Sequence, residues 1–184
     1  MTRVYLIRHC LPDFPGGVRM CLGVTDLPLG PEGLAQAAEM AASLPPVTAV
    51  FSSPLSRALQ TAWAIGLPVT VLEGLRELDA GEWDGLTFPQ IRSRYPALYA
   101  ARGVNPELPL PGGEDPIQGL ARFLKAMHQA AGSGGDCAVV AHGGIIAEFL
   151  KEITGVRRKP DYGEVIPLFR ENNTFYLQEE NHHA

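Results

Sequence analysis

Two histidines of this chain each stand directly after a short apolar run of the kind that forms a buried β-strand. Arg8 and His9 follow Val4–Ile7, and His142 follows Ala138–Ala141. A charged or polar side chain at the end of a buried strand needs a partner unless it serves chemistry. Because ligands bind beyond the carboxyl ends of parallel strands, we expect both histidines to lie at one ligand-binding edge.

A second arginine follows another apolar run, Val47–Phe51. The stretch SSPLSR predicts a helix that begins there, with Ser53 as its N-cap and Pro54 as its first residue. Arg57 then lies one turn into the helix and can reach the same edge. Since arginines hold phosphate oxygens through paired hydrogen bonds, Arg8 and Arg57 together indicate a phosphate site.

The stretch AHGG adds backbone donors to this edge. Gly143 and Gly144 would leave the N-terminus of the following helix open to an anion, which makes Gly143 a candidate substrate-binding residue. A neutral imidazole can attack phosphorus, a second imidazole can stabilise charge, and a protonated carboxyl group can donate to the leaving oxygen. The residue types therefore favour phosphoryl transfer, and the stretch LRELDAGEWDG supplies the candidate carboxyl groups: Glu77, Asp79, Glu82 and Asp84.

Strand-like and helix-like segments alternate along the chain, which predicts an α/β fold, a three-layer α/β/α sandwich with a mostly parallel sheet. The expected strands are Val4–Ile7, Val47–Phe51, Val69–Leu72, Ala138–Ala141, Val165–Phe169 and Thr174–Leu177. The expected helices are Pro31–Leu44, Pro54–Ile65, Asp115–Ala131 and Gly144–Ile153, with a short helical piece at Phe88–Tyr95. Length predicts a single domain over residues 1–184. The irregular stretches 10–29 and 73–114 do not fit the alternation, and we expect a lid-like insertion at about residues 83–116.

Composition narrows the function. A net charge of −5 without a cluster of Lys and Arg argues against a nucleic-acid partner. No stretch reaches the ~18 apolar residues of a membrane span, and the first residues do not resemble a signal peptide, so we expect a cytoplasmic protein. The three cysteines, Cys10, Cys21 and Cys137, have neither disulfide nor metal-site spacing.

Three other side chains have ordinary structural interpretations. Trp63 is expected in the core and His128 on a solvated helix face. Trp83, within the acidic stretch, either packs that stretch or lines the pocket, and the sequence leaves both open.

Five motifs occur in one order: LIRHC, FSSPLSRALQTA, LRELDAGEWDG, PGGED and AHGG. In that order they resemble the histidine phosphatase superfamily, the phosphoglycerate-mutase-like proteins, over about residues 3 to 178. The resemblance implies that His9 is the nucleophile and becomes phosphohistidine. It makes Glu77 the proton donor, with Glu82 as the competing choice. It places Arg8, Arg57 and His142 in the phosphate pocket, puts Gly23 and Thr25 beside the substrate through the stretch GVTDLPLGPEG, and implies no metal and no cofactor.

The expected activity is a phosphomonoesterase that acts on a small phosphorylated metabolite, of the α-ribazole 5′-phosphate type or of broad specificity. The alternatives are mutase-type phosphoryl transfer and a silent phosphate-binding regulatory domain. Cys10 motivates the silent alternative, because the family has glycine there and a side chain could crowd the pocket or require a φ that favours glycine. A cysteine phosphatase of the His-Cys-x5-Arg kind would need arginine at position 16, where this chain has Gly16. Apolar residues of the lid-like insertion could serve a ligand or a homodimer, so the oligomeric state stays open.

Overall fold

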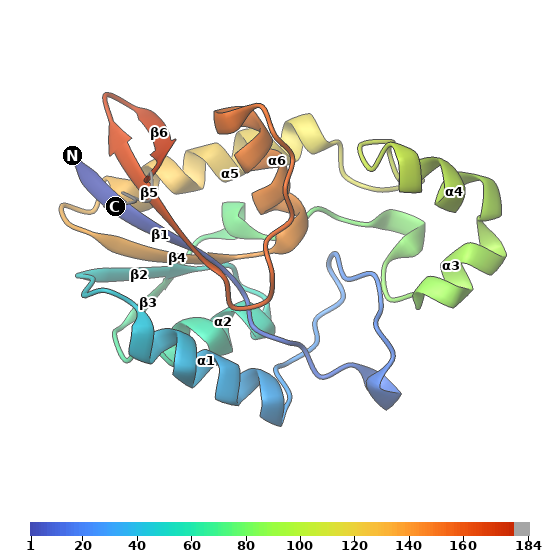
Figure 1. Ribbon diagram of the computed structural model, residues 1–184, viewed down its shortest axis with the longest axis horizontal. Coiled ribbons are helices and arrows are strands. Elements are labelled where there is room, and N and C mark those ends of the chain that lie inside the picture. The colour runs from blue at the N-terminus through green and yellow to red at the C-terminus, as the bar shows by residue number, and fades with distance from the viewer. Residues whose placement is uncertain (179–184) are drawn as a thin grey trace, which may run out of the picture.

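A six-stranded sheet forms the centre of the molecule, with the strand order β3-β2-β4-β1-β5-β6 (Figure 1). The computed structural model describes residues 1–178. The strands β1 to β4 are parallel where they pair, whereas β5 is antiparallel to both β1 and β6. The α/β fold with a mostly parallel sheet is therefore confirmed. The strands are β1 (Thr2–Arg8), β2 (Ala49–Ser52), β3 (Val69–Val71), β4 (Cys137–Ala141), β5 (Val165–Glu171) and β6 (Thr174–Leu177).

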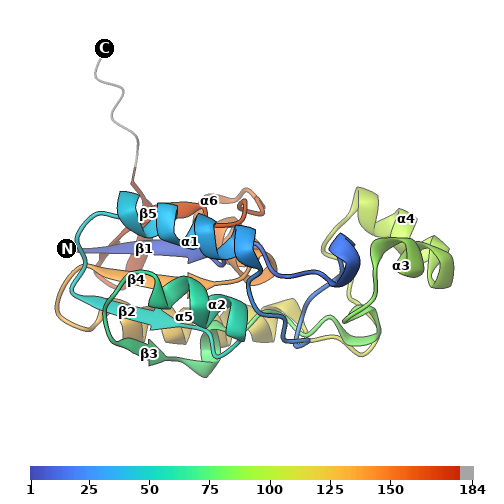
Figure 2. The same ribbon diagram turned by 90° about the horizontal axis from the view of Figure 1, so that it is seen from below.

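Four helices cover the two faces of the sheet (Figures 1 and 2). The helices α1 (Pro31–Ser43) and α2 (Ser56–Trp63) pack on one face, and α5 (Pro116–Ala131) and α6 (Gly143–Thr154) pack on the other. The helices α3 (Phe88–Arg94) and α4 (Pro96–Val104) lie apart, beyond the edge at which β1 ends. None of the helices within residues 1–178 is both long enough and apolar enough to cross a membrane.

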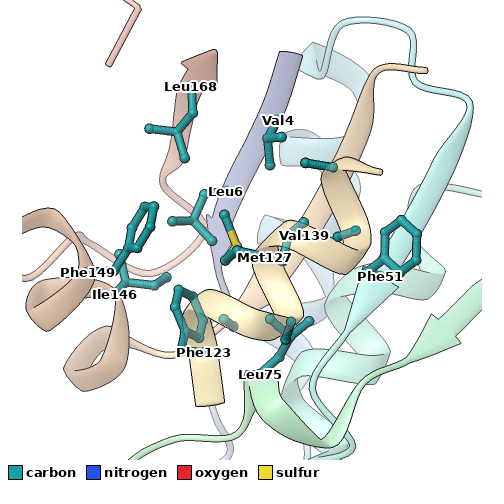
Figure 3. Packing of buried hydrophobic residues seen from close by; sticks show 14 of the residues in the cluster. Val4, Leu6, Phe51, Leu75, Phe123, Met127, Val139, Ile146, Phe149 and Leu168 are labelled. Carbon is teal, nitrogen blue, oxygen red and sulfur yellow. The ribbon is translucent and has the colours of Figure 1, made fainter. Parts of the chain in front are cut away.

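Alternation along the central strands builds a core on each side of the sheet. Val4 and Leu6 of β1 face the cluster under α5 and α6, together with Val139 of β4 (Figure 3). Ile7 and Val140, one residue further along each strand, face the cluster under α1 and α2. Both central strands are thus buried on both faces, which is why they read as continuous apolar runs.

Local signals explain several element ends. The hydroxyl of Thr87 and the side chain of Gln90 form a capping box at the start of α3. Asn172 and Asn173 have φ of 46° and 63°, as the tight turn between β5 and β6 requires. Gly155 ends α6 with a left-handed conformation.

Two features of the chain trace differ from the sequence prediction. The helix α4 lies in the stretch 73–114, whose many Pro, Gly and charged residues predict an irregular segment. Pro96 occupies the first turn of α4, where proline is tolerated. The helix α2 begins at Ser56, and Leu55 takes the N-cap position expected for Ser53.

Two side-chain predictions were wrong. Trp63 is 60% exposed rather than buried, because it lies off the buried face of α2, which is formed by Arg57, Ala58, Thr61 and Ala62. The ring of His128 is half-buried, with its centroid 5.0 Å from that of Phe175, so it packs against the core instead of facing solvent.

Candidate active site

His9 and His142 come together at the carboxyl edge of the sheet, as the strand ends predict. Their ring centroids are 5.0 Å apart and both side chains are buried. The Nδ1–H of His9 donates to the carbonyl oxygen of Cys10 at 2.8 Å. This bond fixes the tautomer of a neutral imidazole and leaves the lone pair on Nε2, which is the nucleophilic atom.

Both histidines are held neutral near pH 7. Burial lowers the pKa of His9 well below its ordinary value, and the cation of Arg57 lowers it further. The bond to the Cys10 carbonyl acts in the opposite direction, and Arg8 and Lys159 add smaller lowering effects. Burial also lowers the pKa of His142 well below the ordinary value, and Arg57 contributes next. Since only a neutral imidazole has a lone pair to donate, this environment suits nucleophilic attack.

Arg8 is fixed beside the start of α6. Its guanidinium stacks 3.7 Å from the ring centroid of Tyr162 and donates to the carbonyl of Pro160 at 2.6 Å. A Cβ added to Gly143 would lie 2.9 Å from Arg8 Nε and 2.6 Å from Cε of Lys159, so a larger residue there would displace the end of one of these side chains. The buried Nε–H of Arg8 has no acceptor within residues 1–178.

Arg57 is completely buried and is held by the segment that the sequence placed beside the substrate. It donates to the carbonyl oxygens of Thr25 at 2.8 Å and Gly23 at 3.0 Å. The carboxylate of Asp84 accepts from both backbone amides and from the Thr25 hydroxyl. Neither Gly23 nor Thr25 lines the cavity described below, so in this structure they orient Arg57. The Nε–H of Arg57 is buried, and no group among the described residues accepts from it.

The hydroxyl of Ser53 contacts His142 instead of capping α2. Its Oγ lies 2.7 Å from Nε2 of His142. The Nδ1 atom of His142 is buried without a partner in residues 1–178. If the serine hydroxyl donates to Nε2, Nδ1 carries a proton that can be donated to a bound anion.

The carboxylate of Glu77 lies at the N-terminus of α6, where the sequence predicted open space for an anion. Its oxygens accept from the amides of Gly144 and Ile145, each at 2.8 Å. A Cβ at Gly144 would come within 2.7 Å of Glu77 Oε1. This glycine therefore admits a carboxylate of the protein itself.

A partly buried arginine holds the backbone around Glu77. Arg122 of α5 donates to the carbonyls of Gly74, Arg76 and Glu77 at 2.8 to 2.9 Å. It also forms two bonds of 2.7 Å to the carboxylate of Glu114, from the PGGED motif. The network ties this motif to the segment that carries Glu77.

Glu82, the competing choice for proton donor, is exposed. Its carboxylate accepts from the hydroxyl of Tyr95 at 2.9 Å, and it does not line the cavity. Glu77 lines the same cavity as His9. Glu82 lies just before the lid-like segment, which comprises residues 83–116.

A cavity of about 470 Å³ lies at this edge of the sheet, and Arg57 and His142 are not among the residues that line it. His9, Arg8 and Glu77 line one end. Trp83 is 95% buried and is also part of the lining, so it both packs its own loop and borders the cavity. The other lining residues of the lid-like segment include Phe88, Tyr99, Arg102, Leu108 and Leu110.

Cys10 does not crowd this cavity. It is fully buried in a small cluster with Leu29 and Ala37, and its amide donates to Oγ1 of Thr61 at 2.9 Å. Its φ is not positive, so its backbone does not require glycine. Burial raises the pKa of its thiol to about 11, which argues against a thiolate nucleophile.

Comparison with known proteins agrees with this geometry. The model of the histidine phosphatase superfamily (branch 1) matches residues 4–163. The chain belongs to the histidine phosphatase superfamily. The family that the five motifs indicated is thus confirmed, and with it, at the level of the family, the expected class of enzyme, a phosphomonoesterase.

Named members of the superfamily are similar over most of their length. A glucosyl-3-phosphoglycerate phosphatase of Mycolicibacterium vanbaalenii is 34% identical over 171 residues, which cover 85% of this chain and 76% of that protein. The uncharacterized phosphatase PhoE of Bacillus subtilis is 31% identical, and the match covers 84% of this chain and 79% of that protein. The structure of a mycobacterial glucosyl-3-phosphoglycerate phosphatase in complex with VO3 superposes with a TM-score of 0.84 at 27% identity, covering 97% of this chain and 98% of that one.

Sequence reasoning missed Lys159 and Tyr162, which lie beside Arg8. Both belong to the segment between α6 and β5. Because β5 is antiparallel to β1 and starts where β1 ends, with Ile7 opposite Val165, this segment finishes at the site. A signal for it was the run RRKP at residues 157–160, but an all-parallel sheet would have placed its end at the opposite edge.

The described residues offer no obvious metal centre. Within residues 1–178, no three His, Cys, Asp or Glu side chains gather closely enough to hold a metal ion. The side chains of Arg8 and Arg57 instead lie close enough to His9 and His142 for their charges to lower the pKa of both imidazoles.

The depressed pKa values predict that the protein becomes less stable in mild acid. A histidine that stays neutral in the folded protein binds a proton only in the unfolded chain. Its contribution to the free energy of unfolding is therefore complete above pH ~6.5 and is lost as the pH falls towards the pKa of the folded state. We expect the free energy of unfolding, measured in urea, to decrease between pH 7.5 and 5.5. His9→Asn should show a shallower decrease than the parent chain, and an equal slope in both would contradict the depressed pKa of His9.

Proposed function

We propose that this protein hydrolyses small phosphate monoesters through a covalent phosphohistidine at His9, without a metal ion. The observation that carries the proposal is that an oriented nucleophile occurs together with buried hydrogen-bond donors that have no acceptor. Nε2 of His9 keeps its lone pair, and the Nε–H groups of Arg8 and Arg57 are buried with no acceptor within residues 1–178. Buried donors of this kind are rare unless a ligand satisfies them.

The first step transfers the phosphoryl group to the enzyme. The lone pair of His9 Nε2 attacks phosphorus, and the bond between phosphorus and the ester oxygen breaks with its electron pair on that oxygen. Arg8, Arg57 and His142 hold the phosphoryl oxygens. The carboxyl group of Glu77, when protonated, gives its proton to the leaving alcohol.

The second step returns the enzyme to its starting state. Water attacks the phosphohistidine and loses a proton to the Glu77 carboxylate, while the nitrogen–phosphorus bond breaks and its electron pair returns to Nε2. The balance is water plus phosphate ester to alcohol plus inorganic phosphate. In this scheme Glu77 gives up its contacts with the α6 amides for at least part of each turnover.

The shape of the cavity supports a small substrate. A volume of about 470 Å³ walled by the lid-like segment fits a metabolite better than a folded protein. The substrate panel starts from α-ribazole 5′-phosphate, which the sequence suggested, and glucosyl-3-phosphoglycerate, after the name of the relatives.

The test is release of p-nitrophenol from p-nitrophenyl phosphate in EDTA. In parallel, a reaction with phosphate-labelled substrate is quenched rapidly without acid, and the phosphate bound to the protein is measured. We expect turnover without metal and a protein-bound phosphate that is labile in acid and stable in base. Turnover that requires an added metal, or a bound phosphate that resists acid, would overturn the proposal. If a bisphosphorylated sugar acid activates the protein tightly, and the phosphohistidine transfers its phosphoryl group to a monophosphorylated sugar acid faster than to water, the protein is a mutase.

A further inference from the structure

The end of the cavity under α4 carries charged side chains that the proposed chemistry does not use. They are Arg102 on α4, Glu107 just after it, Glu148 on α6 and Arg157 after α6, and all four line the cavity. The ion pairs among these side chains determine whether this end of the cavity attracts an anion or a cation.

Both carboxylates are already neutralised by other cations. Glu148 accepts from Nε of Arg157 at 2.8 Å, and Glu107 pairs with Lys151 of α6 at 2.6 Å. Arg102 forms no ion pair within residues 1–178, and its Cζ lies over the ring of Trp83 at 5.6 Å from the centroid, within cation–π range. No carboxylate of the described residues therefore occupies its N–H groups.

The side chain of Arg102 is shielded from much of the solvent. The side chain is only partly exposed, and burial lowers its pKa, with the neighbouring Arg157 acting in the same direction. A partly buried cation without a counter-ion is costly unless an anion joins it. Its planar fork suits a carboxylate, and the face of Trp83 attracts the guanidinium.

This cation lies within the reach of a small molecule bound at His9. His9 and Arg102 line the same cavity, and so does Cys21, which lies close enough to Lys159, Glu77 and Arg102 for each to affect the pKa of its thiol. A ligand that fills the cavity would therefore touch both ends.

We propose that Arg102 forms a second anion subsite, which selects phosphate esters whose leaving alcohol itself carries a carboxylate. This inference rests on the proposed function, since it places the ester phosphate at His9. The negative group would sit at Arg102 against Trp83, while the apolar side chains of the lid-like segment cover the part between the two anions.

The experiment compares two esters of equal shape, 4-carboxyphenyl phosphate and its neutral amide, 4-carbamoylphenyl phosphate. We expect kcat/KM to favour the carboxylate by about 10-fold in the parent chain, the size of one charge-assisted hydrogen-bond pair. Arg102→Met should remove that preference by lowering kcat/KM for the carboxylate about 10-fold more than for the amide. Arg92→Met, which removes an exposed arginine of α3 outside the cavity, is the matched control and should keep the preference.

Binding separates this inference from the proposed function. The phosphonates 4-carboxybenzylphosphonate and 4-carbamoylbenzylphosphonate resist hydrolysis, so calorimetric titration reports the subsite even if no ester is turned over. A preference for the carboxylate that Arg102→Met abolishes supports the subsite whether or not the protein is a phosphatase. Equal binding of the two by the parent chain, or equal losses for both in Arg102→Met, overturns it, and a bisphosphonate that binds more tightly than the carboxylate would show that the subsite takes a second phosphate instead.

Discussion

His9→Ala should lose turnover of p-nitrophenyl phosphate by at least about 10⁴-fold, because it removes the atom that accepts the phosphoryl group. The loss should appear in kcat, since Arg8 and Arg57 still bind phosphate. It should also abolish the acid-labile phosphate on the protein. The measurement is steady-state release of p-nitrophenol, with phosphoprotein trapped at alkaline pH.

His128→Ala is the matched control for this loss. It removes a half-buried imidazole from α5, outside the cavity, so it lowers stability without touching the site. Equal thermal transitions for His9→Ala and the parent chain would establish that the fold is retained. A His9→Ala variant that still turns over within about tenfold of the parent would exclude the phosphohistidine route.

Glu77→Gln should slow phosphoryl transfer from esters of poor leaving groups by about 10² to 10⁴-fold, the usual contribution of a general acid. Alkoxides leave slowly without a proton, whereas p-nitrophenolate needs none. The effect on phosphorylation by p-nitrophenyl phosphate should therefore be much smaller. Single-turnover release of the two leaving groups separates this step from hydrolysis of the phosphohistidine.

Glu82→Gln provides the comparison within the same stretch of sequence. Its carboxylate bonds to Tyr95 and lies outside the cavity, so we expect phosphorylation rates within about twofold of the parent on both esters. If Glu82→Gln slows the poor leaving group and Glu77→Gln does not, the assignment of the acid is wrong.

The parts of the site that the sequence could predict are those at the ends of apolar strands. Arg8, His9 and His142 follow buried runs, and a parallel sheet brings such ends together without further information. Arg57 was also predictable as a helical residue near that edge, although the helix begins at Ser56 rather than Pro54. The position of a residue relative to a strand end therefore predicted whether it reaches the site. The exact first residue of the helix was not needed for that prediction.

The parts that escaped prediction depend on pairing between distant segments. Lys159 and Tyr162 reach the site because β5 runs antiparallel to β1, and an apolar strand reads the same in either direction. The position of Glu77 on the amides of α6 joins two segments through a carboxylate, and local sequence carries no signal for such a bond. The orientation of Cys10 towards Leu29 and Ala37 was likewise decided by tertiary packing.

The place of β1 in the sheet has a consequence for biosynthesis. This strand precedes the other five along the chain, yet its two neighbours are β4 and β5, with Val4 opposite Cys137 and Tyr5 opposite Pro167. A ribosome must therefore release most of the polypeptide before the first strand can gain either partner. Until then an apolar strand with two open edges is exposed to self-association, and such long-range pairing slows folding. Nascent chains arrested before β4 should accordingly depend on chaperones to remain free of aggregates.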